Sequence, residues 1–513
     1  MSSFNLSSPP VSNKLIRLFS YVALVFSIIF GIWYQICLLD YREWGDESET
    51  IVAAKMLARG TSLYSEVFNH HGPLTFLTGY IIELFGNFSI REHRIPIAVL
   101  QWLAIISIYF SPLNKNISER NIYIAIAIAA TISLLPENNL YGHTYTYQVL
   151  CGIFLVIIIS QLTIPSIIDS KSISPVGFAI GNLLISSLPF LAVTYMPAAG
   201  LLYLASLRLG TIKRSIYYLA VGLIANIIFL GLIGSFKGYL AYHIYLNAEI
   251  LPLYNNGHGL FIFAKNIVSA ISSSIEGLMS FAGLLFILSI LINKDESRIS
   301  WRTGFLTLAI LSLLMRGHAI HGVPFWYCYI TLFVIIACQN EMPIKQKLLW
   351  SIFSIICILK LVYPLLISKN YFKNEYRKEV TEFSQLVKNI TDEKDKIIAY
   401  SFRNYEYLAS DRLPASGHFF YLPWQEKYNE NPKLGIAISA CKEIDEYRPK
   451  IMLIDKWIVW GRYDWNTYAG CVQTIIDKFY SQLPDRPYYI RNDLFDKAIN
   501  YHKQSLSQSR SNK

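Results

Sequence analysis

The first 367 residues alternate between long apolar runs and short polar connections. Most of the runs have about 17–25 residues, the length that a helix needs to cross about 30 Å of hydrocarbon. Pro189 and Pro197 interrupt two neighbouring runs, which predicts broken or re-entrant helices there. The pattern predicts a polytopic α-helical membrane protein with about eleven transmembrane helices. They are expected at residues 16–39, 94–111, 122–136, 146–168, 176–192, 196–209, 216–236, 272–292, 303–315, 323–339 and 348–367.

The orientation of these helices follows from the distribution of Lys and Arg. One set of loops is rich in both residues, whereas the opposite set, beyond its long first loop, holds only Lys237, Lys265 and Arg316. Basic loops stay in the cytoplasm, so the N-terminus is expected inside and, after eleven crossings, the C-terminus outside. The first run has no small-residue cleavage site after it and is interpreted as an uncleaved anchor.

The composition changes after the last apolar run. Residues 1–367 are expected to form the transmembrane domain, and residues 368–513, which are polar and rich in tyrosine, a water-soluble external domain. Strand-like runs at 396–401 and 451–454 alternate with helical stretches, which predicts an α/β or α+β fold. This domain holds two cysteines, Cys441 and Cys471, which could form a disulfide outside the cytoplasm.

Composition narrows the class of protein further. Hydrophobic residues make up 53% of the chain and charged residues 16%, against about 25% charged residues in soluble proteins. The formal net charge of +10 does not indicate nucleic-acid binding, because the basic residues lie at helix ends rather than on one face. Glu137 and His143 are expected to be solvated loop residues. Lys360 lies inside the last span, where it either contacts lipid phosphate or snorkels to an interface.

The external loop at residues 40–94 is too long to be a simple connection. Asp46 and Glu49 have the spacing of a capping box, and Gly60 suits the position after a helix, so a helix of about three turns is expected between them. A second helix is expected to begin at Pro73 and to end before Gly86. It is too short to span a bilayer and should lie at the membrane interface.

The sequence of this loop resembles a known family. It reads GDESETIVAAKMLARGTSLYSEVFNHHGPLTFLTGYIIELFG, and it resembles the first luminal loop of the GT-C membrane glycosyltransferases, in the bacterial branch related to protein O-mannosyltransferases and the lipid A aminoarabinose transferase. The segments GHAIHGVPFWY (317–327) and YLASDRLPASGHFFY (407–421) are similar to later parts of such proteins. One departure is that residues 194–197 read TYMP, where the family is expected to have a lysine that contacts substrate.

The resemblance implies a glycosyltransferase of the bacterial inner membrane. Its donor would be a sugar linked to polyprenyl phosphate, and its acceptor an envelope glycan, a lipid or a protein at the external face of the membrane. Two other classes remain open from the sequence. One is a transporter or flippase of lipid-linked glycans, which would require ionisable residues at mid-membrane in paired repeats. The other is a lipid-linked oligosaccharide ligase or a scaffold without catalysis.

Glycosyl transfer requires a base for the acceptor hydroxyl and cations for the departing phosphate. With the resemblance taken into account, Asp46 is the candidate general base, although its residue type and position also suit a helix N-cap. Glu47 is the candidate for a supporting or acceptor-binding role, the alternative being a solvated carboxylate.

Candidate residues for substrate binding also lie outside the acidic pair. Arg316 could hold the phosphate through a bidentate fork, or it could anchor the loop at the membrane interface. His318 and His321 lie close to it in sequence, and His71 could bind a sugar hydroxyl or the phosphate. Two histidines without a local carboxylate do not define a metal site, so no metal ligand and no required cofactor are assigned, although a divalent metal is compatible with them.

Overall fold

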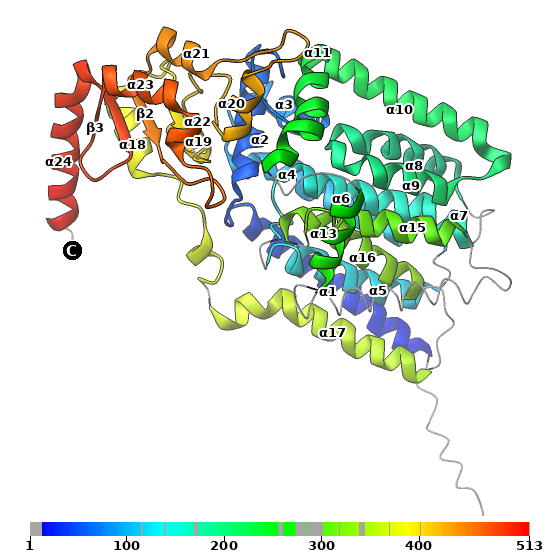
Figure 1. Ribbon diagram of the computed structural model, residues 1–513. Coiled ribbons are helices and arrows are strands. Elements are labelled where there is room, and N and C mark those ends of the chain that lie inside the picture. The colour runs from blue at the N-terminus through cyan, green and yellow to red at the C-terminus, as the bar shows by residue number, and fades with distance from the viewer. Residues whose placement is uncertain are drawn as a thin grey trace, which may run out of the picture.

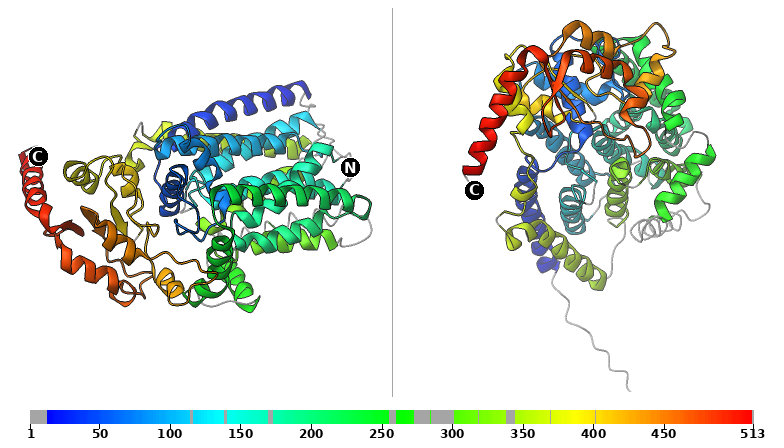
Figure 2. Two further views of the ribbon diagram at one scale, coloured as in Figure 1. Left: turned by 90° about the horizontal axis from the view of Figure 1, so that it is seen from above. Right: turned by 60° about the vertical axis from the view of Figure 1, so that its left-hand side comes forward.

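The structure of this chain, a computed structural model, combines a bundle of long helices with a smaller α+β region at one end of the bundle (Figure 1). Seen from above, α24 lies at the end of the molecule far from the start of α1 (Figure 2). The structure describes residues 13–511 apart from 114–115, 138–139, 169–172, 255–259, 273–283, 285–300, 318, 338–343, 369 and 401.

Among the described residues, five helices are long and apolar enough to cross a membrane. They cover Lys14–Leu38, Ile117–Leu134, Tyr147–Ile168, Leu209–Ile233 and Ile320–Ala337. Shorter apolar helices cover Pro175–Phe190, Val193–Ser206 and Ile352–Ile367. The prediction of a mostly helical chain with several apolar helices is therefore confirmed. The number of eleven spans stays a prediction, and the span expected at 272–292 lies almost entirely outside the described residues.

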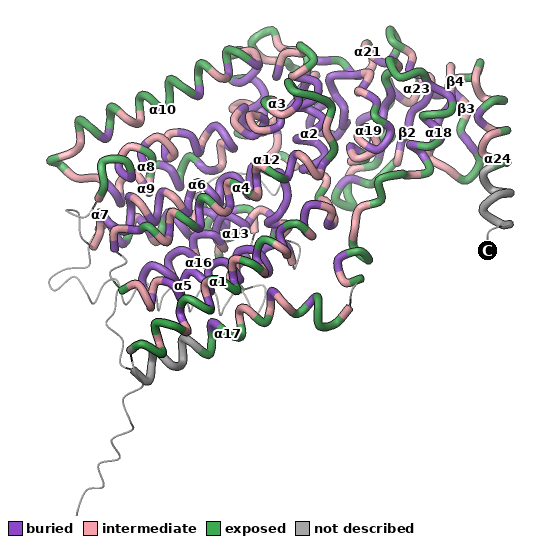
Figure 3. Tube along the Cα trace, turned by 180° about the vertical axis from the view of Figure 1, so that it is seen from behind, coloured by how far each residue is buried: buried purple, intermediate pink, exposed green. Residues whose placement is uncertain are grey.

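The long helices pack side by side, and their outer faces are apolar. α1 (Asn13–Leu38) packs against α5 (Ile117–Ala129) and α17 (Ile344–Ile367), α6 (Tyr147–Ile158) against α4 (Ile90–Tyr109) and α16 (Val323–Ala337), α8 (Pro175–Ser187) against α10 (Ile212–Ile233), and α9 (Met196–Ser206) against α15 (Trp301–Ser312). Figure 3 shows α10 and α17 largely exposed on the outside, where leucine and isoleucine side chains are suited to lipid.

The predicted break at the two prolines is present. The 3₁₀ turn η5 (Leu188–Phe190) ends α8, and a second, η6 (Val193–Tyr195), leads into α9. The remaining helical pieces of this part are η2 (Ala130–Leu134), η3 (Ile159–Thr163), α7 (Ile164–Ile168), η7 (Leu209–Thr211), α11 (Phe236–Gly238), the π-type segment η8 (Tyr239–Ile250), α12 (Leu251–Tyr254), α13 (Leu260–Ser272) and η9 (Ile320–Gly322).

The first loop folds as expected, with one correction. Its helix is α2 (Gly45–Ala58), which ends before Gly60 with a φ of +91°, a conformation that favours glycine. The second helix consists of η1 (Pro73–Phe76) followed by α3 (Leu77–Glu83). The expected capping box is absent: Trp44 is the N-cap residue, and Asp46 lies inside the first turn. Because the helix begins before Asp46, this carboxylate is free for other partners.

The C-terminal α+β region, residues 371–511, is built around a four-stranded sheet. Its order is β1-β2-β4-β3, with β1 and β2 parallel and the other neighbours antiparallel. The strands are β1 (Ile398–Tyr400), β2 (Ile451–Ile454), β3 (Tyr480–Gln482) and β4 (Tyr488–Arg491), so the two predicted strands are present. Helices surround the sheet: η10 (Lys373–Glu375), α18 (Glu382–Ile390), α19 (Tyr405–Ser410), α20 (Pro423–Asn429), α21 (Ala440–Tyr447), α22 (Trp465–Tyr468), α23 (Gly470–Phe479), η11 (Asn492–Leu494) and α24 (Phe495–Ser511). Cys441 and Cys471 form a disulfide with their Cα atoms 6.0 Å apart.

One continuous apolar core joins this region to the first loop. Buried side chains of α2, such as Val52 and Met56, belong to the same cluster as Phe419 and Phe420. The backbones touch as well, because the Phe68 amide donates to the Gly417 carbonyl oxygen at 3.0 Å. A Cβ on Gly417 would lie 1.9 Å from the carbonyl oxygen of Glu66, so only glycine permits this approach. The C-terminal α+β region is therefore held firmly above α2.

Two polar groups that the sequence treats as solvated have partners in the structure. His143 is buried, and its Nε2 lies 2.9 Å from the carbonyl oxygen of Arg42. Lys360 on α17 pairs with Glu137, with 3.1 Å between Nζ and Oε2. Tertiary packing brings these partners together from distant parts of the sequence, which corrects the expectation for His143 and Glu137.

A buried ion pair connects the ends of three helices. The Arg94 guanidinium, on the first turn of α4, binds both carboxylate oxygens of Glu47, with Nε–Oε1 2.7 Å and Nη2–Oε2 2.5 Å. Its Nη1 also donates to the carbonyl oxygens of Leu38 and Tyr41, at 2.9 and 2.7 Å. These carbonyl groups lie at and just after the C-terminal end of α1, where the helix supplies no backbone N–H donors for them. Arg94 therefore fixes the end of α1, the start of α2 and the start of α4 together.

We expect Glu47→Gln to destabilise the protein by about 3–5 kcal/mol, because it leaves the Arg94 charge buried without its counter-ion. Thermal unfolding of the purified protein in detergent measures the effect. A matched control is Glu430→Gln, which removes an exposed pair with Lys427 and should cost at most about 1 kcal/mol. Equal melting temperatures for the two variants would contradict a structural role for the Glu47–Arg94 pair.

Candidate active site

A cavity of about 620 Å³ lies where the first loop, the ends of the apolar helices and the C-terminal α+β region meet. The first loop contributes Trp44, Gly45, Asp46, Glu49, His70 and His71, and the helix ends contribute Leu251, Arg316 and His321. The C-terminal α+β region contributes Phe402, Arg403, Trp424, Asp455, Trp457 and Trp460. Four of the predicted site residues, Asp46, His71, Arg316 and His321, therefore share one cavity, although they are far apart in sequence.

Asp46 faces this cavity from the first turn of α2. Its Oδ2 accepts a hydrogen bond from Gln148 Nε2 at 3.4 Å. Burial raises the pKa of Asp46 above its usual range, while the hydrogen bond from Gln148 and the charge of Arg316 act in the opposite direction. The positive end of the helix dipole also favours the carboxylate form. The carboxylate is thus a stronger base than a solvated aspartate and lies open to a molecule in the cavity.

Arg316 lies in the loop between α15 and η9 and lines the cavity. Its side chain is exposed. Its Nη1 donates to the Tyr147 hydroxyl at 2.5 Å, and its Nη2 lies 3.5 Å from His321 Nε2. Within the described part of the chain, no carboxylate oxygen lies within the 4.0 Å of an ion pair with this guanidinium. An oriented cation without a local counter-ion is suited to bind an anionic group such as phosphate.

The other predicted residues have different positions. Gln148 connects His321 to Asp46: its Nε2 lies 3.3 Å from His321 Nδ1 and also donates to Asp46. His318 lies outside the described residues. Glu47 is fully buried in its pair with Arg94 and also accepts from the Tyr145 amide at 2.8 Å. It does not line the cavity, so the expectation of acceptor binding is replaced by a supporting role.

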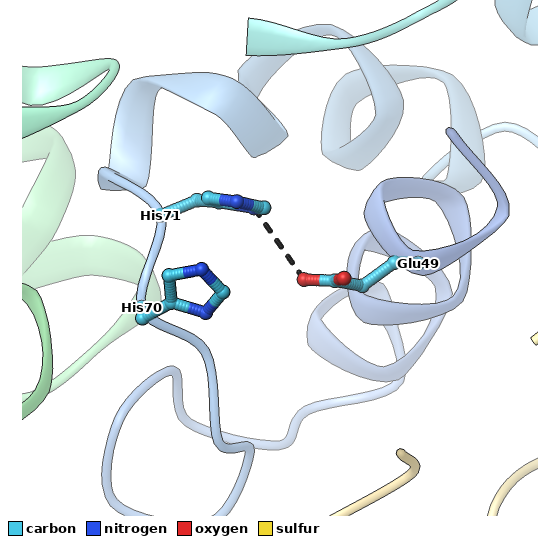
Figure 4. A group of neighbouring side chains, drawn as sticks. All are labelled: Glu49, His70 and His71. Carbon is cyan, nitrogen blue, oxygen red and sulfur yellow. Dashed lines mark ion pairs between the residues drawn. The ribbon is translucent and has the colours of Figure 1, made fainter. Parts of the chain in front are cut away.

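Glu49, His70 and His71 form a second polar cluster on the wall of the cavity (Figure 4). Each offers a ligand atom, and the three atoms lie within 4.8 Å of one another. His71 Nδ1 is 3.4 Å from Glu49 Oε1, and Asn69 Nδ2 donates to the same oxygen at 2.9 Å. The Nδ1 atoms of both histidines are buried without a hydrogen-bond partner among the described residues. Two imidazoles and one carboxylate are a donor set that suits Zn²⁺.

Burial disfavours the charged forms of all three side chains of this cluster. Burial lowers the pKa of His70 to about 3 and that of His71 well below its usual value, so both imidazoles are neutral at pH 7. Burial and the nearby charge of Asp46 raise the pKa of Glu49 well above its usual range. A metal ion would bind the neutral imidazoles directly and would favour the ionised form of Glu49.

Sequence reasoning does not find several residues that line the cavity or hold its lining side chains in place. Glu49 was interpreted only as a capping residue, although its spacing of three from Asp46 places both on one helix face. That spacing was a usable signal. Gln148 and Tyr147 carry no charge and no motif, so no sequence signal indicated them. The aromatic residues from the C-terminal α+β region also had no signal, because nothing in the sequence relates them to the first loop.

We expect the purified protein to bind one Zn²⁺ ion at this cluster, and Glu49→Gln to lose that binding because one of three ligands is removed. Isothermal titration with Zn²⁺ after chelator treatment measures the stoichiometry. His502→Ala is the control: it removes a possible Zn²⁺ ligand on α24, away from the cavity, and should leave the stoichiometry unchanged. Unchanged Zn²⁺ stoichiometry in Glu49→Gln would exclude the cluster as the binding site.

The sequence matches no family model and no curated protein. Two solved structures share its fold. ArnT from Cupriavidus metallidurans in the apo state has a TM-score of 0.51 at 9% identity, over 87% of this chain and 94% of ArnT. The same protein bound to undecaprenyl phosphate has a TM-score of 0.52 at 10% identity, over 93% of this chain and 98% of ArnT. ArnT is the lipid A aminoarabinose transferase, a GT-C enzyme. The chain therefore shares the fold of ArnT, a GT-C enzyme, as the resemblance of its first loop implies.

Proposed function

We propose that this chain is a glycosyltransferase that moves a single sugar from a polyprenyl-phosphate-linked donor to an acceptor hydroxyl. One observation carries the proposal: Asp46, a carboxylate with a raised pKa, and Arg316, a cation without an ion-pair partner among the described residues, line one cavity at the ends of the helices. Such a transfer requires a base on one side of the anomeric carbon and positive charge on the other.

The reaction follows from the positions of these groups. The acceptor oxygen attacks the anomeric carbon of the donor and transfers its proton to the Asp46 carboxylate. The bond between the anomeric carbon and the phosphate oxygen breaks, and the electron pair leaves with the polyprenyl phosphate. Arg316 binds the phosphate and stabilises its added negative charge. The Tyr147 hydroxyl and His321 hold the guanidinium in place, and Gln148 orients Asp46.

A lipid-linked donor agrees with the surroundings of the cavity. The apolar helix Ile320–Ala337 begins beside His321 and only four residues after Arg316, so a polyprenyl chain can lie along it while its phosphate reaches the guanidinium. The ArnT structure of the same fold is bound to undecaprenyl phosphate, which supports a phosphate carrier of this chemical class. The distribution of Lys and Arg supports a cavity on the external side of a bacterial inner membrane, with a cytoplasmic N-terminus. The acceptor would be an envelope glycan, a lipid or a protein.

Asp46→Asn should reduce transfer by roughly 100-fold or more, because the amide keeps the size of the carboxylate and loses its basicity. Sugar transfer from a single-sugar polyprenyl phosphate to isolated envelope acceptors measures the rate. Asp392→Asn, an exposed residue far from the cavity, is the matched control. Near-normal turnover of Asp46→Asn, with normal insertion in the membrane, would remove Asp46 as the base.

The pH dependence of the wild type provides a further check on Asp46. The base must be ionised, so kcat/KM should fall as the pH is lowered through the pKa of Asp46. Since burial raises that pKa, the acid limb should lie above about 3.9, the ordinary value for an aspartate. An acid limb at or below that ordinary value would contradict a buried base.

Arg316→Lys should remain impaired, with a higher KM for the donor and a lower kcat, because an ammonium cannot reproduce the guanidinium fork. Arg316→Ala should be weaker still. Arg486→Lys, which alters an exposed pair with Glu382, is the matched control and should behave as wild type. If Arg316→Ala kept the donor KM and kcat of the wild type, the phosphate would be bound elsewhere.

A further inference from the structure

The wall of the cavity opposite the helix ends is aromatic. Phe402, Trp424, Trp457 and Trp460 line it from the C-terminal α+β region, and Trp44 faces the same space from the first loop. Four of the ten tryptophans of the chain thus gather at one cavity. The mechanism above uses none of them.

These rings form an ordered surface. Trp424 and Trp460 stack, with 4.9 Å between ring centroids and 19° between planes. Trp457 meets Phe402 edge to face at 5.8 Å. Trp457 and Trp460 remain 37% and 43% exposed. Tryptophan has a large apolar side chain whose burial would stabilise the fold, so this exposure is notable. Exposed tryptophans that line a cavity are typical of a binding surface rather than of a core.

A tight turn fixes the backbone at one of these rings. Val459 is buried and its amide donates to the Tyr463 carbonyl oxygen at 2.9 Å, which closes a tight turn. Trp460 in this turn has a φ of +52°, and Gly461 follows with a φ of +69°. A tryptophan in the left-handed backbone conformation is uncommon. Here the turn, anchored by the buried Val459, holds Trp460 in that conformation. The turn therefore fixes the backbone at Trp460, and Trp457, which also lines the cavity, lies two residues before the start of the turn.

Polar groups stand at the edge of the aromatic surface. Arg403 Nε donates to Asp455 Oδ2 at 2.8 Å, and both side chains are partly exposed to the cavity. Trp424 Nε1 is buried without a hydrogen-bond partner among the described residues. Trp424 lines the cavity, and its indole N–H is a donor for which the described residues supply no acceptor.

We propose that this surface is the acceptor subsite and that it binds a pyranose ring of a glycan acceptor. The flat apolar face of a sugar ring packs on the tryptophan faces, while its hydroxyls bind Arg403, Asp455 and the Trp424 indole N–H. The proposal rests on the proposed function and deepens it, because it selects a saccharide among the classes of acceptor. The surface belongs to the C-terminal α+β region, away from the apolar helices, so it is the wall suited to the acceptor rather than to the lipid-linked donor (Figure 1).

The test is direct binding by the full-length protein in nanodiscs, without turnover. The probes are methyl pyranosides of a hexose, an N-acetylhexosamine and a deoxyhexose, and sorbitol serves as an open-chain polyol without a ring face. Saturation-transfer NMR should detect contacts to the ring C–H protons of at least one pyranoside and none to sorbitol. The double variant Trp457→Ala/Trp460→Ala should weaken this binding by about tenfold or more, because it removes two of the aromatic faces on which the sugar ring packs.

Two controls separate loss of the subsite from loss of the fold. Trp301→Ala, on the exposed start of α15, should bind the pyranosides as the wild type does. Trp460→Phe, which keeps an aromatic face, should retain most of the binding that the double variant loses. The proposed function is tested separately, by the transferase activity of Asp46→Asn. If Asp46→Asn kept its transferase activity, the catalytic proposal would fail while the subsite stood.

Two results would overturn the subsite. One is a signal from the pyranosides that is no stronger than that of sorbitol, or that is unchanged in the double variant. The other concerns a membrane role for the same turn. If brominated phosphatidylcholine in the nanodisc quenched Trp457 and Trp460, measured as the difference between wild type and the double variant, the turn would contact lipid rather than sugar.

Discussion

The site depends first on one buried guanidinium. Arg94 binds the carbonyl oxygens at the end of α1 and both carboxylate oxygens of Glu47, and both side chains are buried, so losing one partner would leave the other charge unpaired. Neighbouring helical residues point about 100° apart, so fixing Glu47 toward the core turns Asp46 toward the cavity. The two acidic residues of the loop therefore have opposite roles. One holds the helix in place, and the other is presented to the substrate.

The second constraint is the charge distribution around the cavity. Asp46 and Glu49 share a face of α2, and burial favours their neutral forms, while Arg316 on the facing wall keeps its charge. When a bound substrate fills the cavity and excludes water, a fixed cation acts more strongly on a phosphate than it would in solution. The aromatic wall from the C-terminal α+β region closes the same space from the other side. Gly417 permits the close backbone contact that keeps this wall above α2.

Much of the fold could be predicted from the sequence, because it depends on local patterns. Apolar runs indicated the long helices, Gly60 and Pro73 marked the ends of the two loop helices, and short β-rich runs marked β1 and β2. The capping box of Asp46 and Glu49 was wrong, since the helix begins at Gly45 and Glu49 turns to Asn69 and His71 instead. A capping pattern and a pair of site carboxylates have the same spacing, so local sequence does not separate them.

The sequence by itself determined the helical membrane character, the GT-C-like loop and the choice of Asp46 and Arg316 as candidates. Only the tertiary structure decided that Glu47 is buried with Arg94, that Glu49 joins two histidines, and that tryptophans from the C-terminal α+β region face Asp46. The reason is physical. Helix and strand patterns arise from neighbours along the chain, whereas ion pairs and cavity walls arise from residues that only packing brings together. No spacing in the sequence records those long-range contacts.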